Sequence, residues 1–125
     1  SPAGLTTSPP FGLTGLSLAA FDPARHTHAE WVDGKVHETG FTTVFPPNTL
    51  VSYTSGDATY DVDFLSATET NLGDTYAAVT ARSYHTGIVN VLLMDGSVRS
   101  VSSAVSGTTW RALGTRAGGE IVGAY

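Results

Sequence analysis

Three histidines and a glutamate stand close together in the segment HTHAEWVDGKVHETG, residues 26–40. If Asp33 and Gly34 form a two-residue turn between two strands, strand alternation gathers four side chains on one face. The four candidate metal ligands are His26, His28, Glu30 and His37. Imidazole nitrogens and a carboxylate suit zinc or copper. A solvated polar face explains the same pattern and is favoured over a metal, because Lys35 beside the site would repel a cation. The same alternation turns Trp31 inward.

Three aspartates form a second group of candidate metal ligands. Asp57 belongs to a Ser-Gly-Asp turn, and Asp61 and Asp63 project to one side of the strand that follows. Hard carboxylate oxygens of this kind suit calcium. The chain has no twelve-residue calcium loop with a central glycine and a final glutamate, so an exposed acidic turn and strand is the main alternative. No cofactor is firmly indicated, and zinc, copper and calcium are the ions to consider.

Other kinds of chemistry find little support in the residues present. The chain has no cysteine that could pair with a histidine, and it has no Gly-x-Ser-x-Gly motif that would present a nucleophilic serine. The glycine-rich stretch GTRAGGE follows a predicted helix and has no lysine, unlike a phosphate-binding loop. Six Lys and Arg residues against eleven Asp and Glu give a net charge of −5, which disfavours nucleic acid as a partner. We therefore expect no catalytic residues and favour a non-enzymatic role.

Turn residues divide the chain between Trp31 and Val101 into strand-sized pieces. The 14 glycines, the 6 prolines and a charged fraction of only 14% favour strands over surface helices. The predicted fold is therefore α+β and β-rich, an antiparallel sheet of hairpins closed by one short C-terminal helix. A length of 125 residues suits one domain. We expect residues 1–20 to be a linker or irregular lead-in and residues 21–125 to form a single globular head domain.

The segment SYHTGIVNVLLMDGSVRSVS is predicted to form one hairpin. With Asp95 and Gly96 as a two-residue turn, Met94 lies opposite Ser97. The face toward the core then holds Val89, Val91, Leu93 and Val98. His85 enters the hairpin at its base, where its ring is expected to bond a backbone group and tie the arm to the rest of the sheet. On this interpretation, His85→Ala lowers the melting temperature more than it affects binding.

One helix is predicted near the C-terminus, in the segment SGTTWRALGTRAGG. Thr108 or Thr109 provides the N-cap, and Gly118 and Gly119 follow the end of the helix. Large aromatic side chains are expected mostly to anchor the core, because each of them buries a large apolar area. These aromatic residues are Phe41, Phe45, Tyr53, Tyr60, Phe64, Tyr76, Tyr84 and Trp110.

The C-terminal part of the chain carries a recognisable motif, a histidine followed by nine residues and Asp-Gly, and then the stretches SVRSVS and TTWRALGTRAGGEIVG. In these features it resembles a large bacterial family of pilin-like proteins, a domain of unknown function with a prepilin-type N-terminus. The matching positions are His85, Asp95, Gly96, Trp110, Arg111, Gly114, Arg116, Gly118, Gly119 and Glu120. The pieces HTHAEWVDGKVHETGFTTVFPPNT, YDVDFLSATE and TYAAVTARSYH are also similar, so the resemblance covers most of residues 26–125.

This resemblance implies a pseudopilin, made with a short basic leader and a hydrophobic N-terminal helix, cleaved and methylated by a prepilin peptidase, and assembled in the cell envelope. The chain has no such helix, so we expect it to be the C-terminal head or a processed piece. The implied role is structural, in assembly or adhesion within a type II secretion or pilus-like system. The implied location is the cell envelope or the extracellular space.

The resemblance also implies the partners. These would be other pilin-like subunits or envelope proteins, and the membrane would be contacted only through the N-terminal helix. Some pseudopilins hold calcium, which keeps that ion under consideration. An alternative function of another class is a metal-dependent enzyme or a module that binds a small molecule or carbohydrate through His28, Glu30 and His37.

Overall fold

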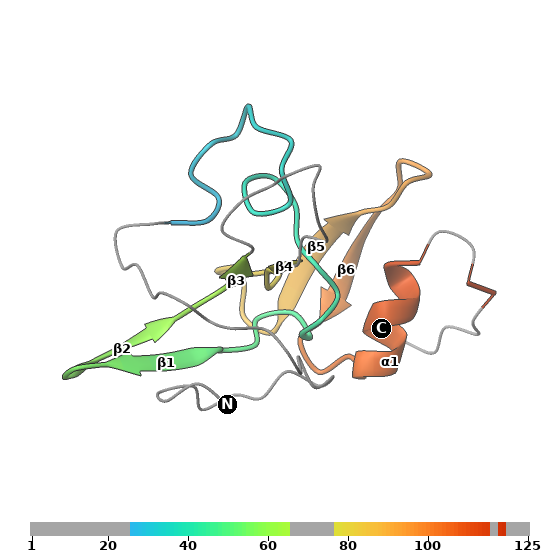
Figure 1. The fold of residues 1–125 in the computed structure, drawn as a ribbon. Helices are drawn as coiled ribbons and strands as arrows, with labels where there is room; N and C mark the ends of the chain where they lie inside the picture. The colour runs from blue at the N-terminus through green and yellow to red at the C-terminus, as the bar shows by residue number, and fades with distance from the viewer. Residues whose placement is uncertain (1–25, 66–76, 116–117, 120–125) are drawn as a thin grey trace.

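The structure is a computed structural model in which residues 26–65, 77–115 and 118–119 are described (Figure 1). The elements in chain order are β1 (Ser52–Ser55), β2 (Ala58–Asp61), β3 (Phe64–Leu65), β4 (Ala77–Ala78), β5 (Ile88–Leu92), β6 (Val98–Ser102) and α1 (Gly107–Leu113). The described part of the chain is therefore β-rich with one short C-terminal helix, as the sequence predicts. The expected lead-in at residues 1–20 lies outside the described residues.

The strands do not form one continuous sheet, so that part of the prediction is wrong. They pair as three separate two-stranded antiparallel sheets, β1 with β2, β3 with β4, and β5 with β6. The segments between the sheets hold their neighbours through single backbone bonds and side-chain bonds instead of strand ladders. For example, Val79 N–H donates to Thr42 Oγ1 over 3.1 Å, and Thr80 N–H donates to Asp63 Oδ1 over 3.0 Å. Backbone groups paired in this way are not available to extend a sheet.

The β1–β2 hairpin follows its turn chemistry. Ser55 pairs with Ala58, which leaves Gly56 and Asp57 as a two-residue turn. Gly56 has a φ of 59°, and a left-handed glycine at the first central position is the arrangement of a type II′ turn. The predicted turn at this position is confirmed.

The β5–β6 hairpin exists as predicted, but its register is shifted by one residue. Leu92 pairs with Val98, and Leu93 N–H donates to Ser97 O over 2.8 Å. The loop therefore has three residues, ending in Gly96 with a φ of 84°. A three-residue loop of this kind needs only one residue in the left-handed region, and the glycine supplies it without help from Asp95.

The shifted register changes which side chains reach the core. Val89 and Val91 are buried as predicted, and Val101 joins them. Val98 was expected in the core, yet it is 67% exposed because the shift moves it to the outer face beside Leu92.

Helix α1 begins earlier than the predicted caps. Its N-cap is Ser106, whose side chain accepts a hydrogen bond from Thr109 N–H over 3.1 Å. Thr108 and Thr109 are already helical, so neither caps the helix. Trp110 is 1% exposed and stacks on Phe41 with ring centroids 5.5 Å apart. The buried indole fixes α1 against the inner face of the β5–β6 hairpin.

Two hydrophobic clusters make up the described core. One contains Ala81, Val89, Val91, Val101, Val105 and Trp110, and the other contains Phe45, Val51, Phe64 and Ala78. Ala78 and Ala81 lie on one short stretch, with Val79 and Thr80 fully buried between them. This stretch, residues 78–81, connects the two clusters.

The predicted aromatic anchors divide into three groups. Phe45, Phe64 and Trp110 are buried, whereas Phe41, Tyr53 and Tyr60 are partly exposed and Tyr84 is fully exposed. Tyr76 lies outside the described residues. Trp31 was expected to point inward, but it is 87% exposed.

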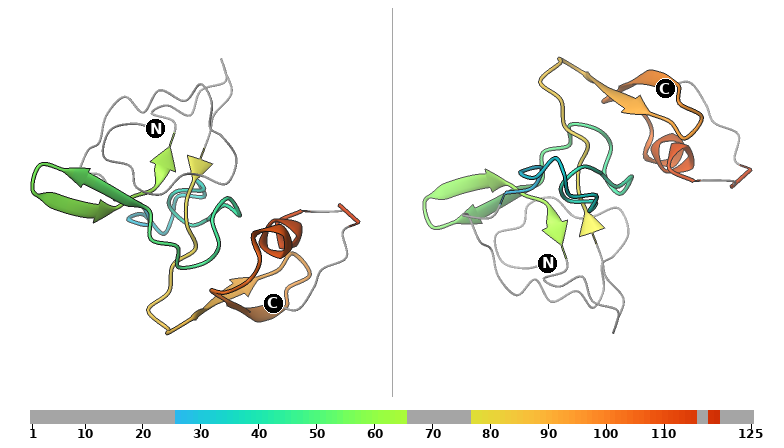
Figure 2. Two further views of the ribbon diagram at one scale, coloured as in Figure 1. Left: turned by 90° about the horizontal axis from the view of Figure 1, so that it is seen from below. Right: turned by 90° about the horizontal axis from the view of Figure 1, so that it is seen from above.

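The hairpins sit at opposite ends of the molecule. Figure 2 shows the β1–β2 hairpin projecting at one end, while β5, β6 and α1 lie together at the other. Among the described residues, no helix has the length and apolar character needed to cross a bilayer.

Candidate functional site

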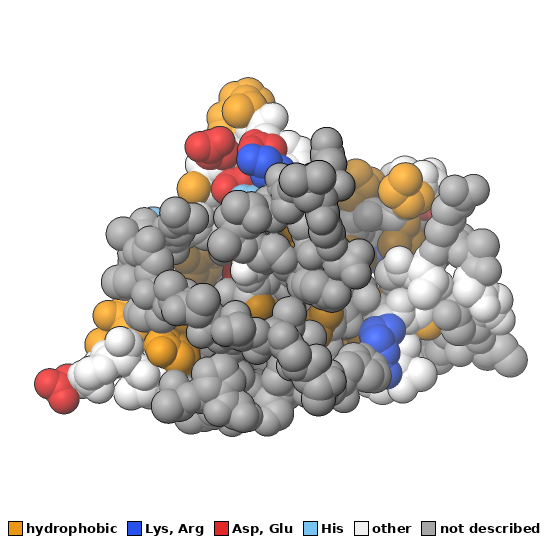
Figure 3. All heavy atoms as spheres, in the orientation of Figure 1, with side chains coloured by type: hydrophobic (Ala, Val, Ile, Leu, Met, Phe, Trp, Pro, Cys, Tyr) orange, Lys and Arg blue, Asp and Glu red, His pale blue; other side chains and the backbone are white. Residues whose placement is uncertain are grey.

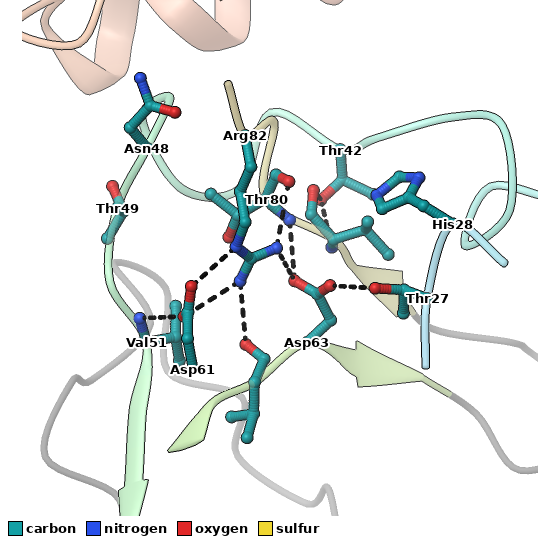
Figure 4. A network of polar contacts seen from close by, with 12 residues as sticks. Thr27, His28, Thr42, Asn48, Thr49, Val51, Asp61, Asp63, Thr80 and Arg82 are labelled. Carbon is teal, nitrogen blue, oxygen red and sulfur yellow. Dashed lines mark hydrogen bonds and ion pairs between the residues drawn. The ribbon is translucent and has the colours of Figure 1, made fainter. Parts of the chain in front are cut away.

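Arg82 lies at the centre of a polar network that joins three segments of the chain (Figure 4). Its Nε donates to Asp61 Oδ2 over 2.8 Å, and its Nη2 donates to Asp61 Oδ1 over 3.1 Å. Its Nη1 donates to Asp63 Oδ1 over 2.7 Å. The planar guanidinium therefore grips one carboxylate with two parallel bonds and a second carboxylate with one.

The remaining donors of Arg82 are also used. Nη1 donates to Thr80 O over 3.2 Å, and Nη2 approaches Val62 O at 3.5 Å. An arginine has five N–H donors, and here each of them has an acceptor. Partial burial by itself would lower the pKa of Arg82, but the hydrogen bonds and charges of Asp61 and Asp63 outweigh burial and raise it. Arg82 is therefore a structural clamp with no spare donor for an anionic ligand.

The two aspartates are satisfied by protein donors. Asp63, with a side chain only 4% exposed, accepts from Thr80 N–H over 3.0 Å and from the Thr27 hydroxyl over 2.9 Å. Asp61 Oδ1 also accepts from Val51 N–H over 2.9 Å. The predicted common side of Asp61 and Asp63 is confirmed. However, it faces Arg82, and the third aspartate, Asp57, lies apart at the exposed tip of the β1–β2 hairpin.

The histidine-rich segment does not form the predicted hairpin. His28 N–H donates to His37 O over 2.8 Å, so His28 rather than Glu30 lies opposite His37. The chain between them makes two successive turns, with Asp33 N–H donating to Glu30 O and Glu38 N–H donating to Lys35 O. Because turns replace strands, the alternation that gathered the four ligands does not apply.

Glu38 organises this loop, although no motif in the sequence points to it. Its Oε2 accepts from the N–H groups of Ala29 and Glu30 over 2.9 and 2.8 Å. The backbone carbonyl of Glu38 lies 3.0 Å from His28 Nδ1, which must carry the proton because a carbonyl only accepts. A glutamate that accepts backbone N–H groups across a loop leaves no periodic signal in the sequence.

The structure does not bring the predicted metal ligands His26, His28, Glu30 and His37 together. Within residues 26–65, 77–115 and 118–119, no three His, Cys, Asp or Glu side chains are grouped so that they could hold a metal ion. The favoured alternative, a solvated face of the same hairpin, does not describe this segment either, because turns replace the two strands.

Asn48 joins the segments at the base of the β5–β6 arm. Its N–H donates to Ala81 O over 2.8 Å, and its side-chain oxygen accepts from Ser83 N–H over 2.8 Å. Its side-chain nitrogen donates to Ser103 Oγ over 2.8 Å and to Ile88 O over 3.4 Å. Asn48 has a φ of 56°, a conformation that asparagine tolerates better than most residues. The only signal for this position in the sequence is the run Pro46-Pro47-Asn48, which is typical of a turn.

The arm is therefore tied down by Asn48 and not by His85. His85 is exposed, and it is its backbone N–H, not its ring, that bonds to Ser83 Oγ over 3.1 Å. At the other end of the arm, Asp95 Oδ1 accepts from the N–H and the hydroxyl of Ser97 over 2.9 and 2.7 Å. These bonds, the hydroxyl bond first, hold the pKa of Asp95 below its ordinary value.

The remaining motif residues lie at or beyond α1. Trp110 is buried, and Arg111 lies half-buried in the last turn. Gly114 ends the helix against Thr43, whose Cγ2 would lie 2.7 Å from any Cβ added there. Arg116 and Glu120 lie outside the described residues.

One cavity of about 320 Å³ opens beside these features. It is lined by His28, residues 39–41, residues 81–83 and residues 89–91 of β5. This volume is at the lower end of the range for ligand pockets.

The sequence matches no protein-family model, no curated protein and no solved structure.

Proposed function

We propose that the chain is the globular head domain of a pilin-like, pseudopilin-type protein of the cell envelope, with a structural, assembly or adhesive role in a type II secretion or pilus-like system. The observation that carries this proposal is the form of the β5–β6 arm. The segment with the motif of histidine, nine residues and Asp-Gly folds as one arm, fixed at its base by Asn48. A fixed base and a projecting tip suit a subunit whose work is contact with other proteins.

The surface of the arm supports the same proposal. Leu92, Met94 and Val98 are 72%, 104% and 67% exposed. Figure 3 shows hydrophobic side chains at the end of this hairpin and on the loop at the top of the view. Isolated exposed apolar residues are ordinary, but several on one projecting arm are typical of a contact surface.

The polar interior is consistent with a scaffold rather than a reaction centre. The charged groups of the clamp are used within the protein, since Arg82 has an acceptor for each donor and Asp63 is nearly buried. On this proposal the partners are other pilin-like subunits or envelope proteins, and the location is the envelope or the extracellular space.

Site-specific cross-linking tests the proposal, because the chain contains no cysteine. The full-length protein, expressed in the cells that carry its gene, is given Met94→Cys on the arm or, as a control, Thr54→Cys on the exposed β1–β2 hairpin. We expect the protein in the envelope fraction and cross-linked adducts that depend on position 94. A full-length reading frame without a hydrophobic N-terminal segment, or a protein found only in the cytosol, contradicts the proposal.

A further inference from the structure

Strand β5 has an edge that no other described strand occupies. In an antiparallel pair, alternate residues exchange both of their backbone bonds with the partner, and the residues between them direct theirs away. Leu93 N–H donates to Ser97 O, and Ser103 N–H donates to Gly87 O. The backbone N–H and C=O groups of the odd-numbered residues of β5 therefore point toward β6. The N–H and C=O groups of Asn90 and Leu92 point to the other side.

Strand β5 itself lacks several of the features that usually protect an edge. Native edge strands carry a lysine, a proline or a bulge, or are covered by another segment. The sequence of β5 is IVNVL, without charge or proline, and it pairs with β6 in unbroken register. Ile88 O already receives Asn48 Nδ2, so the unused groups are those of Asn90 and Leu92.

The cavity lies along the same edge. Residues 89–91 line it, together with residues 39–41 and 81–83. Phe41, Ala81 and the two buried valines of β5 supply apolar surface, while Thr39 and Ser83 supply hydroxyls.

We propose that this cavity and the free edge of β5 form a groove, which binds an extended peptide that adds to β5 as a third strand. In an antiparallel arrangement, one peptide residue exchanges two backbone bonds with Asn90, and the residue two positions away exchanges two with Leu92. Alternate side chains of the peptide then enter the apolar part of the cavity.

Charge selects the kind of peptide. Arg82 borders the cavity and is bound to the carboxylates of Asp61 and Asp63, so this cluster carries one positive and two negative charges, a net charge of −1. The whole chain carries −5. The apolar lining of the cavity favours small apolar residues at alternate positions of the peptide, and the negative charge of the chain favours basic residues at its ends. This inference goes beyond the proposed function, because strand addition does not require a filament or an envelope.

Fluorescence anisotropy with a labelled peptide, acetyl-Lys-Thr-Val-Thr-Val-Thr-Lys-amide, tests the proposal. We expect saturable binding that weakens at least about tenfold in Asn90→Pro, which removes the outward N–H group. Ser100→Pro is the matched control. It removes an N–H directed away from β5 and, like Asn90→Pro, loses the bond between Ser100 Oγ and Asn90 Oδ1. Its affinity should stay within about twofold of the parent protein.

Two further measurements keep the test independent of how the variants fold. A peptide N-methylated at alternate residues should lose binding to the unmodified protein, because it cannot form the ladder. A peptide with glutamate in place of both lysines should bind more weakly at low salt. The proposal is overturned if none of the peptides binds saturably, or if both proline variants bind equally. It is also overturned if the protein alone sediments as a dimer that Asn90→Pro dissociates, since the occupant would then be a second copy.

Discussion

Arg82 Nη1 lies 2.7 Å from Asp63 Oδ1, and the Asp63 side chain is only 4% exposed. The same carboxylate receives Thr80 N–H and the Thr27 hydroxyl. The carboxylate of Asp63, which follows β2, therefore connects two other segments. These are the segment of Thr27, before β1, and the stretch at residues 78–81 between the two hydrophobic clusters.

Removing this carboxylate should be costly. Asp63→Ala leaves one N–H of Arg82, the N–H of Thr80 and the hydroxyl of Thr27 without an acceptor. We therefore expect the free energy of unfolding to fall by about 2 to 3 kcal/mol. Urea denaturation measures the change. Asp57→Ala, at the exposed tip of the β1–β2 hairpin, is the control and should stay within about 0.5 kcal/mol of the parent. Equal losses in the two variants would contradict the structural role of Asp63.

Asn48 should matter through both its side chain and its backbone conformation. Asn48→Gly keeps the left-handed φ but loses the side-chain bonds to Ser83, Ile88 and Ser103. We expect a loss of about 2 kcal/mol in unfolding free energy. Asn48→Ala adds the strain of a Cβ at positive φ and should be less stable by about another 1 kcal/mol. Thermal and urea denaturation check the order, and an alanine variant more stable than the glycine variant would contradict it.

His85→Ala should leave stability nearly unchanged, contrary to the expectation from sequence. The residue is exposed and its one described bond is made by its backbone N–H, which alanine retains. We expect a change within about 0.5 kcal/mol by urea denaturation. A loss as large as that of Asn48→Gly would show that the ring holds the arm after all.

Ser97→Ala should raise the pKa of Asp95, because the hydroxyl bond is the main cause of its depression. A carboxyl group with a depressed folded-state pKa contributes stability above its unfolded pKa and loses that contribution as pH falls through the folded value. The stability difference between Ser97→Ala and the parent should therefore be full at neutral pH and shrink below about pH 4.

Carbon-13 NMR titration of the Asp95 carboxyl measures its pKa. Urea denaturation at neutral pH and below about pH 4 measures the stability difference. Ser97→Thr retains a hydroxyl and is the control. A titration curve of Asp95 that is the same in Ser97→Ala and the parent would rule out the hydroxyl as the cause.

The helix cap can be located by a pair of alanine variants. Ser106→Ala should lower the unfolding free energy by about 1 kcal/mol, because Thr109 N–H loses its acceptor. Thr108→Ala, on the exposed first turn, should change it by less than about 0.5 kcal/mol. Urea denaturation compares the two, and the reverse order would place the cap at Thr108.

Local chemistry was predictable from the sequence, and distant partners were not. The turns at Gly56 and Gly96 follow from glycine's tolerance of positive φ. The common side of Asp61 and Asp63 follows from strand alternation. However, a two-residue and a three-residue loop can both contain Asp-Gly, so the register of the β5–β6 hairpin was wrong by one residue.

The misses share a physical cause. Arg82 reaches carboxylates 19 and 21 positions earlier in the chain, and the side chain of Asn48 reaches groups 35 to 55 positions away. Contacts of this range depend on the completed fold, and neither periodicity nor local propensity reports them. The hairpin predicted for the histidine-rich segment was wrong for a related reason. Glu38 binds the N–H groups of Ala29 and Glu30 across the loop, and the segment forms two successive turns.

The stretch at residues 78–81 has an evolutionary consequence. Ala78 belongs to one cluster and Ala81 to the other, and Val79 and Thr80 between them are fully buried. An inserted or deleted residue there would displace the residues of one cluster relative to the other. The hairpin tips at Gly56 and Gly96, by contrast, are open to solvent. Homologous chains should therefore vary in length at the hairpin tips and keep a constant length across this short tether.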